Sequence, residues 1–325
     1  MNEKALITGA GGFIGSHLVE AALQSGCEVR AFVRYNSAGS AGWLDRLPCR
    51  SDVEVVAGDI RDYGSVLRAT RGCGRVFHLA ALIGIPYSYE SQLAYVRTNV
   101  EGTFNVLEAA RELGTVNVLI ISTSETYGTA QYVPIDEKHP AVGQSPYAAT
   151  KIAADQLALS YYHSFELPVS IARPFNTYGP RQSQRAIIPA IIAQILSGQR
   201  TIRLGRLSPT RDLTFVKDTA EGILAVAHGA EFAGTATNIG RNEEISMGAL
   251  ALTIASLMNV EVLIEEDPAR VRPEASEVER LRCDNRRILA LTNWKPRYDL
   301  ETGLGETIAW SRTHSDLTKA QDYAV

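Results

Sequence analysis

A glycine-rich turn near the start of the chain constrains the fold more than any other feature of the sequence. The apolar run at 4–8 leads into TGAGGFIG (8–15), and apolar residues at helical spacing continue over 13–24. Glycines permit a tight turn, and they let backbone N–H groups approach a pyrophosphate at a helix N-terminus. Between a strand and a helix, this spacing predicts a dinucleotide site. The residues expected to bind the dinucleotide there are Gly9, Gly12, Phe13, Ile14 and Gly15.

Short apolar runs alternate with helical patterns through the first half of the chain. The expected strands are residues 4–8, 28–33, 53–57, 75–79, 117–122 and 168–173. The expected helices are 13–24, 62–71, 91–113 and 145–166. Strict alternation predicts an α/β fold, a Rossmann doubly wound parallel sheet covered by helices on both faces. Ligands of such a fold bind at the carboxyl ends of the strands.

The pattern changes after Pro174, where turns rich in proline and glycine, a helix near 186–198 and shorter mixed elements begin. We expect residues 1–174 to form an NAD(P)-binding Rossmann domain and residues 175–325 to form mainly a smaller C-terminal lobe that binds the substrate. Segments near 211–240 are expected to return to the Rossmann domain. Residues 36–47, which begin rich in glycine and serine, are interpreted as an exposed excursion.

The composition argues against several classes of partner. The formal net charge is −4 with no basic block, so we expect no binding to nucleic acid or to an anionic membrane surface. Apolar runs are shorter than the roughly 18 residues that span a bilayer, and the polar first residues leave no room for a signal peptide. The four cysteines lie far apart, which predicts reduced thiols, no metal site and a cytoplasmic location.

The end of the second expected strand bears on the choice of cofactor. Proteins that bind NAD usually carry an acidic residue about 20 residues beyond the glycines, where it binds the ribose hydroxyls. This chain has Arg34 there, and a guanidinium attracts a 2′-phosphate. We therefore predict NADP, with NAD as the alternative if Arg34 is only a solvated surface residue.

Two further segments are expected at the same site. Asp59 and Ile60 follow the third expected strand, where a carboxylate can accept a hydrogen bond from the adenine amino group. The segment that closes the fourth strand, and lets the backbone pass close to the cofactor, contains Leu79, Ala80 and Ala81. The neighbouring His78 is interpreted as a satisfied core histidine without a chemical role.

A tyrosine and a lysine lie one helical turn apart in SPYAATK (145–151), which has serine and proline at the expected helix start. A free phenol has a pKa of about 10. An ammonium about 5 Å away, at an effective dielectric of about 20, lowers that pKa by about 2 units. We therefore expect Tyr147 to be the base for an alcohol proton, with Lys151 beside it, and both to contact the cofactor.

The fifth expected strand ends in ISTSETYG (121–128), and its carboxyl end faces the cofactor crevice. Thr123 can hydrogen-bond the reacting oxygen. A simple alcohol dehydrogenase or a 4-epimerase needs only hydride transfer and a hydroxyl proton relay. The carboxylate of Glu125 indicates a second proton, taken from carbon, and the alternative is a solvated glutamate at a strand end.

The motifs resemble those of the extended short-chain dehydrogenase/reductase family over nearly the whole chain. The matching segments are TGAGGFIG, HLAA, STSETYG, YAATK and RPFNTYGPRQ. Within this family the chain is similar to the nucleotide-sugar 4,6-dehydratases, first to the bacterial NDP-N-acetylglucosamine 4,6-dehydratases of the legionaminic-acid type and next to GDP-mannose 4,6-dehydratase. VRYNS (33–37) resembles the VRRSS segment of the latter, which uses NADP, and RPEASEV (272–278) also resembles that group.

The resemblance implies a tightly bound cofactor that is reduced and reoxidised within one turnover. Tyr147 takes the O4 proton while hydride leaves C4, and the new ketone acidifies C5–H, which Glu125 removes. The C6 hydroxyl leaves as water with its proton handled by Glu125 or Ser124, and hydride returns to C6 to give a 4-keto-6-deoxy sugar. Some dehydratases have an aspartate where Ser124 stands, so its absence favours a dual role for Glu125.

The resemblance also implies how the smaller lobe holds a nucleotide-diphosphate sugar. Asn176 corresponds to a contact with the sugar-linked phosphate. Arg211 and Arg272 correspond to arginines that clamp the diphosphate, and Arg185 is a weaker candidate. For each arginine a surface salt bridge is the alternative. The family further implies a homodimer packed through the helices at 91–113 and 145–166.

Two alternative functions remain open at this point. A UDP-glucuronate decarboxylase or a nucleotide-sugar epimerase would use the same scaffold, and the decarboxylases also carry a TSE triplet. A non-catalytic NADP-binding regulator should lack Tyr147, Lys151 or Glu125, and all three are present.

Overall fold

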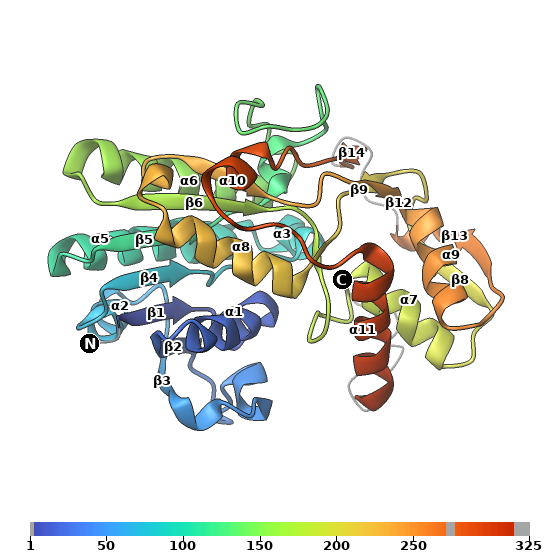
Figure 1. Cartoon of the computed structure of the whole chain (residues 1–325), viewed down its shortest axis with the longest axis horizontal. Helices are drawn as coiled ribbons and strands as arrows, with labels where there is room; N and C mark the ends of the chain where they lie inside the picture. Colours follow the sequence, from blue (N-terminus) through green and yellow to red (C-terminus); the bar gives the residue numbers. More distant parts are fainter. Residues whose placement is uncertain (1–2, 271–276, 315–325) are drawn as a thin grey trace.

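The computed structural model describes residues 3–270 and 277–314, and seven parallel strands form its central sheet (Figure 1). In spatial order these strands are β11 (Ala236–Ile239), β6 (Val169–Pro174), β5 (Asn117–Ile121), β4 (Arg75–His78), β1 (Lys4–Thr8), β2 (Glu28–Arg34) and β3 (Val53–Gly58). The order reverses between β4 and β1, the place where an open α/β sheet forms a ligand crevice. The predicted Rossmann fold is confirmed.

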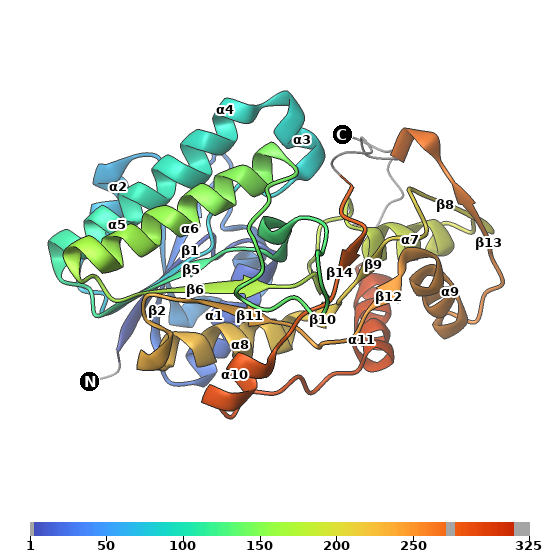
Figure 2. The ribbon, with the colours of Figure 1, turned by 90° about the horizontal axis from the view of Figure 1, so that it is seen from above.

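Helices cover both faces of this sheet (Figure 2). One face carries α2 (Tyr63–Thr70), α3 (Ile85–Glu90), α4 (Gln92–Tyr95), the π-helical turn η3 (Val96–Glu101), α5 (Gly102–Leu113) and α6 (Pro146–Phe165). The other face carries α1 (Phe13–Gln24), α8 (Val216–His228) and α10 (Arg286–Leu291). Each of the six strands expected from the sequence ends within one residue of its predicted bounds.

Two apolar cores explain why the strands are rich in hydrophobic residues on both of their faces. Along β1, Ile7 belongs to the core under α1 and α8, whereas Leu6 belongs to the core under α5 and α6, and both are fully buried. Strands that are buried on both faces need apolar residues at every position rather than at alternate ones.

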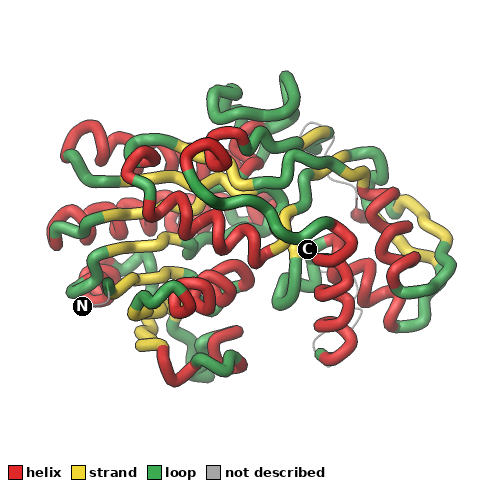
Figure 3. Tube along the Cα trace, viewed as in Figure 1, coloured by secondary structure: helices red, strands yellow, loops and turns green. Residues whose placement is uncertain are grey.

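The chain returns to the Rossmann domain after it has entered the smaller lobe. Helix α8 packs against α1, and β11 pairs with β6 at the edge of the central sheet. Helix α8 and strand β11, within residues 216–239, therefore lie with the helices and strands of the first domain (Figure 3).

The smaller lobe has its own apolar core, which includes Ile191, Leu250, Ile254 and Leu304. Its helices are α7 (Ile187–Leu196), α9 (Met247–Leu257) and α11 (Leu300–Thr313). Its strands are β8 (Thr201–Leu204), β9 (Thr210–Arg211), β12 (Ile245–Ser246), β13 (Leu263–Glu266) and β14 (Arg280–Leu281), and β7 (Thr177–Tyr178) pairs with β10 (Thr214–Phe215) beside it.

Within residues 3–270 and 277–314, the helices lack the combination of length and apolarity that a membrane crossing requires. The same residues contain no group of three histidine, cysteine, aspartate or glutamate side chains that could hold a metal ion.

Candidate active site

The glycine-rich loop leaves the first turn of α1 open to an anion. Gly12 is the N-cap of α1 and supplies no side-chain hydrogen bond to the first turn, so the N–H groups there remain available. Gly9 has a left-handed φ of +68°, and a Cβ on it would lie 2.9 Å from the backbone nitrogen of Ala80. A Cβ on Gly15 would lie 2.2 Å from the Gly9 carbonyl oxygen. The loop thus fits the pyrophosphate of a dinucleotide.

The segment after β2 begins as the exposed excursion that the sequence predicted, since residues 37–40 are exposed, but around Ala41–Leu44 it packs back against this loop. The Trp43 backbone N–H donates to the Gly11 carbonyl at 3.0 Å. Leu44, in the 3₁₀ turn η1 (Gly42–Arg46), is fully buried. The Trp43 ring meets Trp310 of α11 edge-on, with centroids 5.5 Å apart. This contact joins the cofactor side of the molecule to the C-terminal helix.

Hydrogen bonds at the end of β4 satisfy both nitrogens of His78. Nδ1 lies 2.8 Å from the Thr8 hydroxyl and Nε2 lies 3.1 Å from the Thr103 hydroxyl. The Thr8 hydroxyl also accepts the N–H groups of Leu79 and Ala80, each at 3.1 Å. Burial lowers the pKa of His78 to about 3, which keeps it neutral. The network fixes the backbone of residues 79–81, as expected of a structural histidine.

Arg34 and Asp59 lie near each other at the ends of β2 and β3. The Arg34 side chain is exposed, and no described residue makes a hydrogen bond or ion pair with its guanidinium. The Asp59 carboxylate accepts Nε of Arg61 at 2.9 Å, so it already has a partner that would compete with an adenine amino group. Ile60 is buried, and its carbonyl accepts Nδ2 of Asn105 at 3.0 Å.

The turn after β5 carries three of the expected catalytic residues. Thr123 caps the 3₁₀ turn η4 (Ser124–Tyr127), and its hydroxyl accepts the Glu125 N–H at 3.2 Å. Ser124 is buried, with 2% of its surface exposed. Glu125 is half-buried, and no described residue makes a hydrogen bond or ion pair with its carboxylate. Its negative charge contributes to raising the pKa of the Tyr147 phenol, so the two side chains lie near enough to interact electrostatically.

Helix α6 brings Tyr147 and Lys151 to that turn. The Ser145 hydroxyl accepts the Ala148 N–H at 3.1 Å, so the helix begins where the sequence predicted. Tyr147 is buried and packs edge-on against Tyr95, with ring centroids 6.3 Å apart. Lys151 is 5% exposed, and its Nζ donates to the Ile121 carbonyl at 2.6 Å. The strand end and the helix are thereby locked together at the site.

The electrostatics of the chain by itself differ from the sequence-based expectation. Burial raises the pKa of Tyr147 above its ordinary value, the Thr123 hydroxyl lowers it, and the Glu125 carboxylate raises it. Burial also lowers the pKa of Lys151, and Asp155 raises it. In the protein alone the pKa of Tyr147 is therefore raised and does not show the predicted fall, because the loss of hydration is the largest influence on the phenol.

Asn99 was not singled out from the sequence and is a structural member of the site. It lies in the π-helical turn η3, which interrupts the single helix expected over 91–113. Its side chain accepts the Leu82 N–H at 2.8 Å and donates to the Thr150 hydroxyl at 3.1 Å. Such turns are frequent at functional sites. Here the turn ties the segment after β4 to α6 beside Tyr147.

Two of the four residues expected to bind the substrate have side-chain groups without a described partner. The side-chain oxygen of Asn176 is buried and has no hydrogen-bond donor among the described residues. Arg185 is exposed, with no described partner for its guanidinium. Arg211 is buried and pairs with Glu277, with Nη2 and Oε1 3.4 Å apart. Arg272 lies outside the described residues.

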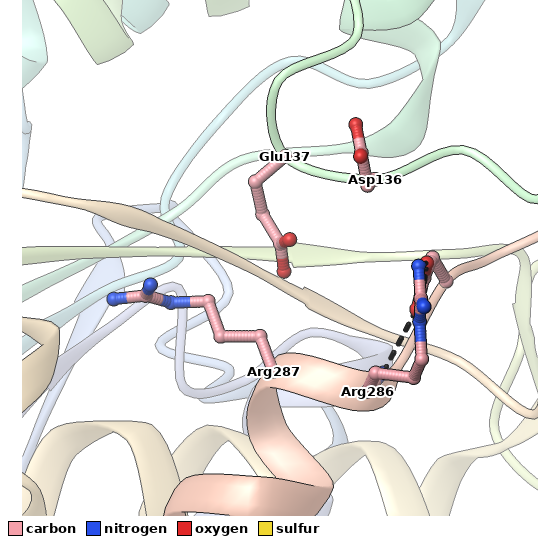
Figure 4. A pocket seen from close by; sticks show the side chains of 5 residues that line it. Asp136, Glu137, Arg286 and Arg287 are labelled. Carbon is pink, nitrogen blue, oxygen red and sulfur yellow. Dashed lines mark hydrogen bonds and ion pairs between the residues drawn. The ribbon is translucent and has the colours of Figure 1, made fainter.

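A surface cavity lies apart from these residues, between the segment after η4 and α10 (Figure 4). Its lining residues are Asp136, Glu137, Asp284, Arg286 and Arg287. Several of these groups already have partners, since Asp284 pairs with Arg286, and Glu137 accepts the Asn238 N–H at 2.9 Å. None of the expected site residues lines this cavity.

The geometry agrees with comparisons to known proteins. A model of the family described as GDP-mannose 4,6 dehydratase matches residues 6–307. The chain belongs to this family. It is 32% identical over 324 residues to the dTDP-glucose 4,6-dehydratase of Streptomyces griseus, which covers 97% of this chain and 95% of the relative. The chain is therefore an enzyme of the nucleotide-sugar 4,6-dehydratase family.

Solved structures extend this family relationship. The dTDP-glucose 4,6-dehydratase of Bacillus anthracis, in complex with NAD, superposes with a TM-score of 0.86 at 26% identity, covering 97% of this chain and 98% of that chain. A UDP-N-acetylglucosamine 4-epimerase of Methanobrevibacter ruminantium, in complex with UDP-N-acetylmuramic acid, gives 0.85 at 26% identity, with 96% and 99% covered. The fold thus occurs in both dehydratases and epimerases.

Proposed function

We propose that this enzyme is a nucleotide-sugar 4,6-dehydratase that converts an NDP-hexose, specifically NDP-N-acetylglucosamine, to its 4-keto-6-deoxy form. The observation that carries the proposal is the Glu125 carboxylate, half-buried, without a described partner and acting on the Tyr147 phenol. Hydride transfer at an alcohol carbon needs one base for the hydroxyl proton. A second, unpaired base beside it suits the removal of a proton from carbon.

Residues of α6 and Thr123, the N-cap of η4, carry out the oxidation half of the reaction. Tyr147 takes the O4 proton, the Thr123 hydroxyl orients that oxygen, and the Lys151 ammonium supports the phenolate. The glycine loop with Gly9, Gly12 and Gly15 would hold a nicotinamide dinucleotide, which would supply the chemistry that takes hydride from C4 and gives it back at C6. Because the pKa of Tyr147 is raised in the protein alone, its phenolate depends on the nearby Lys151 ammonium and on the positive charge that an oxidised nicotinamide would add.

The elimination half falls to Glu125, with Ser124 beside it. Once C4 is a ketone, C5–H is acidic enough for a carboxylate to remove. The leaving C6 hydroxyl needs a proton, which Glu125 can return, and the buried Ser124 is the other candidate. A carboxylate that first takes and then gives a proton needs no second acid.

The diphosphate of the substrate is assigned to Asn176, Arg185, Arg211 and Arg272. The buried Asn176 oxygen has no described donor, and the exposed Arg185 has no described acceptor. Arg211 must exchange its 3.4 Å pairing with Glu277 for the phosphate, which costs part of the binding energy.

The free state of all four cysteines agrees with a cytoplasmic enzyme.

We propose that the cofactor is NADP, because the exposed Arg34 is available for a 2′-phosphate. The native protein freed of cofactor should bind NADP⁺ more tightly than NAD⁺ by roughly 1.5–3 kcal/mol. Arg34→Asp should reverse that order, because the new carboxylate repels the phosphate. Calorimetric titration measures both affinities, and equal affinities in the native protein would refute the assignment.

We also propose a homodimer packed through α5 and α6. Exposed apolar residues recur on one side of the α4–η3–α5 segment, at Leu93, Val96 and Phe104. A solvent-facing stripe of this kind suits a second copy of the chain. Sedimentation of the protein measures the mass directly, and a monomer at all concentrations would reject the dimer.

The function itself is tested with a panel of nucleotide sugars and no added cofactor, followed by mass analysis. Loss of one water from the N-acetylglucosamine conjugate is the expected result. Loss of carbon dioxide from a uronate would instead assign a decarboxylase, and an isomer of unchanged mass that chromatography separates from the substrate would assign an epimerase.

A further inference from the structure

A buried charged cluster lies beneath Tyr147 and Lys151 and has no role in the reaction as described above. Asp155 is one helical turn beyond Lys151 on α6 and has no exposed surface. Its Oδ2 accepts Ser122 Oγ at 2.9 Å, and it accepts Nε and Nη2 of Arg173 at 3.1 and 2.8 Å. Its Oδ1 is buried and receives no hydrogen bond from a described residue. One oxygen of this carboxylate therefore holds its ion pair with Arg173 and its described hydrogen bonds, and the other oxygen holds none.

The Arg173 guanidinium, on β6, is shared between two partners. Its Nη1 donates to the Tyr127 hydroxyl at 3.0 Å, and the guanidinium carbon lies 5.0 Å from the Tyr127 ring centroid. The Tyr127 hydroxyl donates in turn to Oδ1 of Asn238 at 2.7 Å. Arg173 thus binds both Asp155 and the residue at the end of η4. The cluster joins α6, β6 and the turn that carries Glu125.

Among the described residues no carboxylate pairs with Lys151, whose ammonium instead donates to the neutral carbonyl of Ile121. The titratable and charged groups around it are Tyr147 and Asp155 on α6, Arg173 on β6, His78 on β4, Glu125 on η4 and Tyr95 on α4. The histidine is held neutral by burial, and the tyrosines are neutral at ordinary pH. Of the two carboxylates in this set, only Asp155 is fully buried.

We propose that Asp155 is a positioning residue whose buried carboxylate keeps the Lys151 ammonium charged beneath Tyr147. An ammonium taken out of water loses its proton readily unless an anion lies nearby. Asp155 supplies that anion from the same helix face, while Ser122 and Arg173 fix its orientation. Without it, Lys151 and Arg173 would be two buried cations with no fully buried anion between them. The value of this charge for catalysis rests on the proposed function of Tyr147 and Lys151.

The direct test follows the Lys151 ammonium in the full-length protein without substrate. Lysine is labelled with ¹³C at Cε, the Lys151 signal is identified by its loss in Lys151→Arg, and its titration midpoint is measured against pH. Asp155→Asn keeps the side-chain shape and removes the charge, so the midpoint should fall by about one pH unit. Ser122→Ala removes one hydrogen bond to the same oxygen and no charge, so its midpoint should stay at the native value.

Arg173→Gln provides an opposite test, which also serves if Asp155→Asn does not fold. Asp155 stays ionised in the alkaline range where a lysine titrates, so removal of the neighbouring cation should raise the Lys151 midpoint. A purely structural role for Asp155 predicts the reverse for Asp155→Asn, since loosening hydrates the ammonium and moves its midpoint upward. An unchanged or raised midpoint in Asp155→Asn, or an unchanged or lowered one in Arg173→Gln, overturns the proposal.

A second readout connects the charge to the reaction. In Asp155→Asn the alkaline limb of substrate-dependent cofactor reduction should move to lower pH, whereas in Ser122→Ala it should not. A native-like limb in Asp155→Asn would contradict the proposal even if the overall rate fell. If the native enzyme reduced its cofactor with no nucleotide sugar, the proposed function would fail, and the ¹³C midpoints would still decide the role of Asp155.

Discussion

Glu125→Gln is expected to reduce its bound cofactor when given substrate and yet to release almost no keto product. The variant keeps the shape of the side chain but cannot accept a proton. Oxidation at C4 relies on Tyr147 and continues, whereas removal of C5–H loses its base and should slow by about 10²–10⁴-fold. The measurement pairs nicotinamide absorbance, which should rise and stay high, with mass analysis of the sugar.

Glu137→Gln is the matched control for this variant. Glu137 is also incompletely exposed and accepts the Asn238 N–H, a hydrogen bond that a glutamine can keep, and it lies on the surface cavity away from Tyr147. It should turn over like the native enzyme. If Glu125→Gln released product at the native rate, Glu125 would be an ordinary polar residue at a strand end.

Tyr147→Phe is expected to abolish cofactor reduction itself. The change removes one oxygen and leaves the edge-on packing against Tyr95 in place. Without the phenol no described side chain is assigned to the O4 proton, so the rate of reduction should fall by about 10²–10⁴-fold. Stopped-flow absorbance with substrate added to the cofactor-loaded enzyme measures this step alone.

Tyr161→Phe, on the same helix, separates chemistry from packing. Tyr161 donates its hydroxyl to Glu108 at 2.8 Å, far along α6 from the site. It should reduce the cofactor at a near-native rate. Comparable losses in both variants would mean that α6 tolerates no lost phenol, and the special role of Tyr147 would fall.

Features that depend on a local pattern could be predicted from the sequence. The inner strands are mostly apolar because they are buried on both faces, and Ser145 and Pro146 predicted the start of α6, where they act as N-cap and first residue. The glycine turn and the i, i+4 pair Tyr147 and Lys151 carry their own signals for the same reason. Position along the chain is enough for such features.

Features that depend on distant partners could not be predicted. The π-helical turn at Asn99 is stabilised by Leu82 and Thr150, which are remote in sequence. The segment at Trp43 is held by Gly11 and Trp310, which are remote from it in sequence. Its composition alone could not show these contacts, and it therefore suggested exposure for the whole segment.

The electrostatic state of the site was also out of reach, because it depends on burial. A sequence gives the spacing of Tyr147 and Lys151 but not the loss of hydration that raises the pKa of one and lowers that of the other. Asp155 had a signal in its spacing, since it repeats the i, i+4 step beyond Lys151. The spacing alone does not assign a role to Asp155, because its contacts with Arg173 and Ser122 are visible only in the structure.

Turnover in heavy water tests the central claim, that this site removes a proton from carbon, most directly. The reaction is run on the nucleotide sugar that the enzyme accepts, and the product is examined by NMR for deuterium at each carbon. A dehydratase should place solvent deuterium at C5, while the hydrogen that leaves C4 arrives at C6 without exchange. Protium retained at C5 would contradict the account, and the epimerase alternative would then take its place.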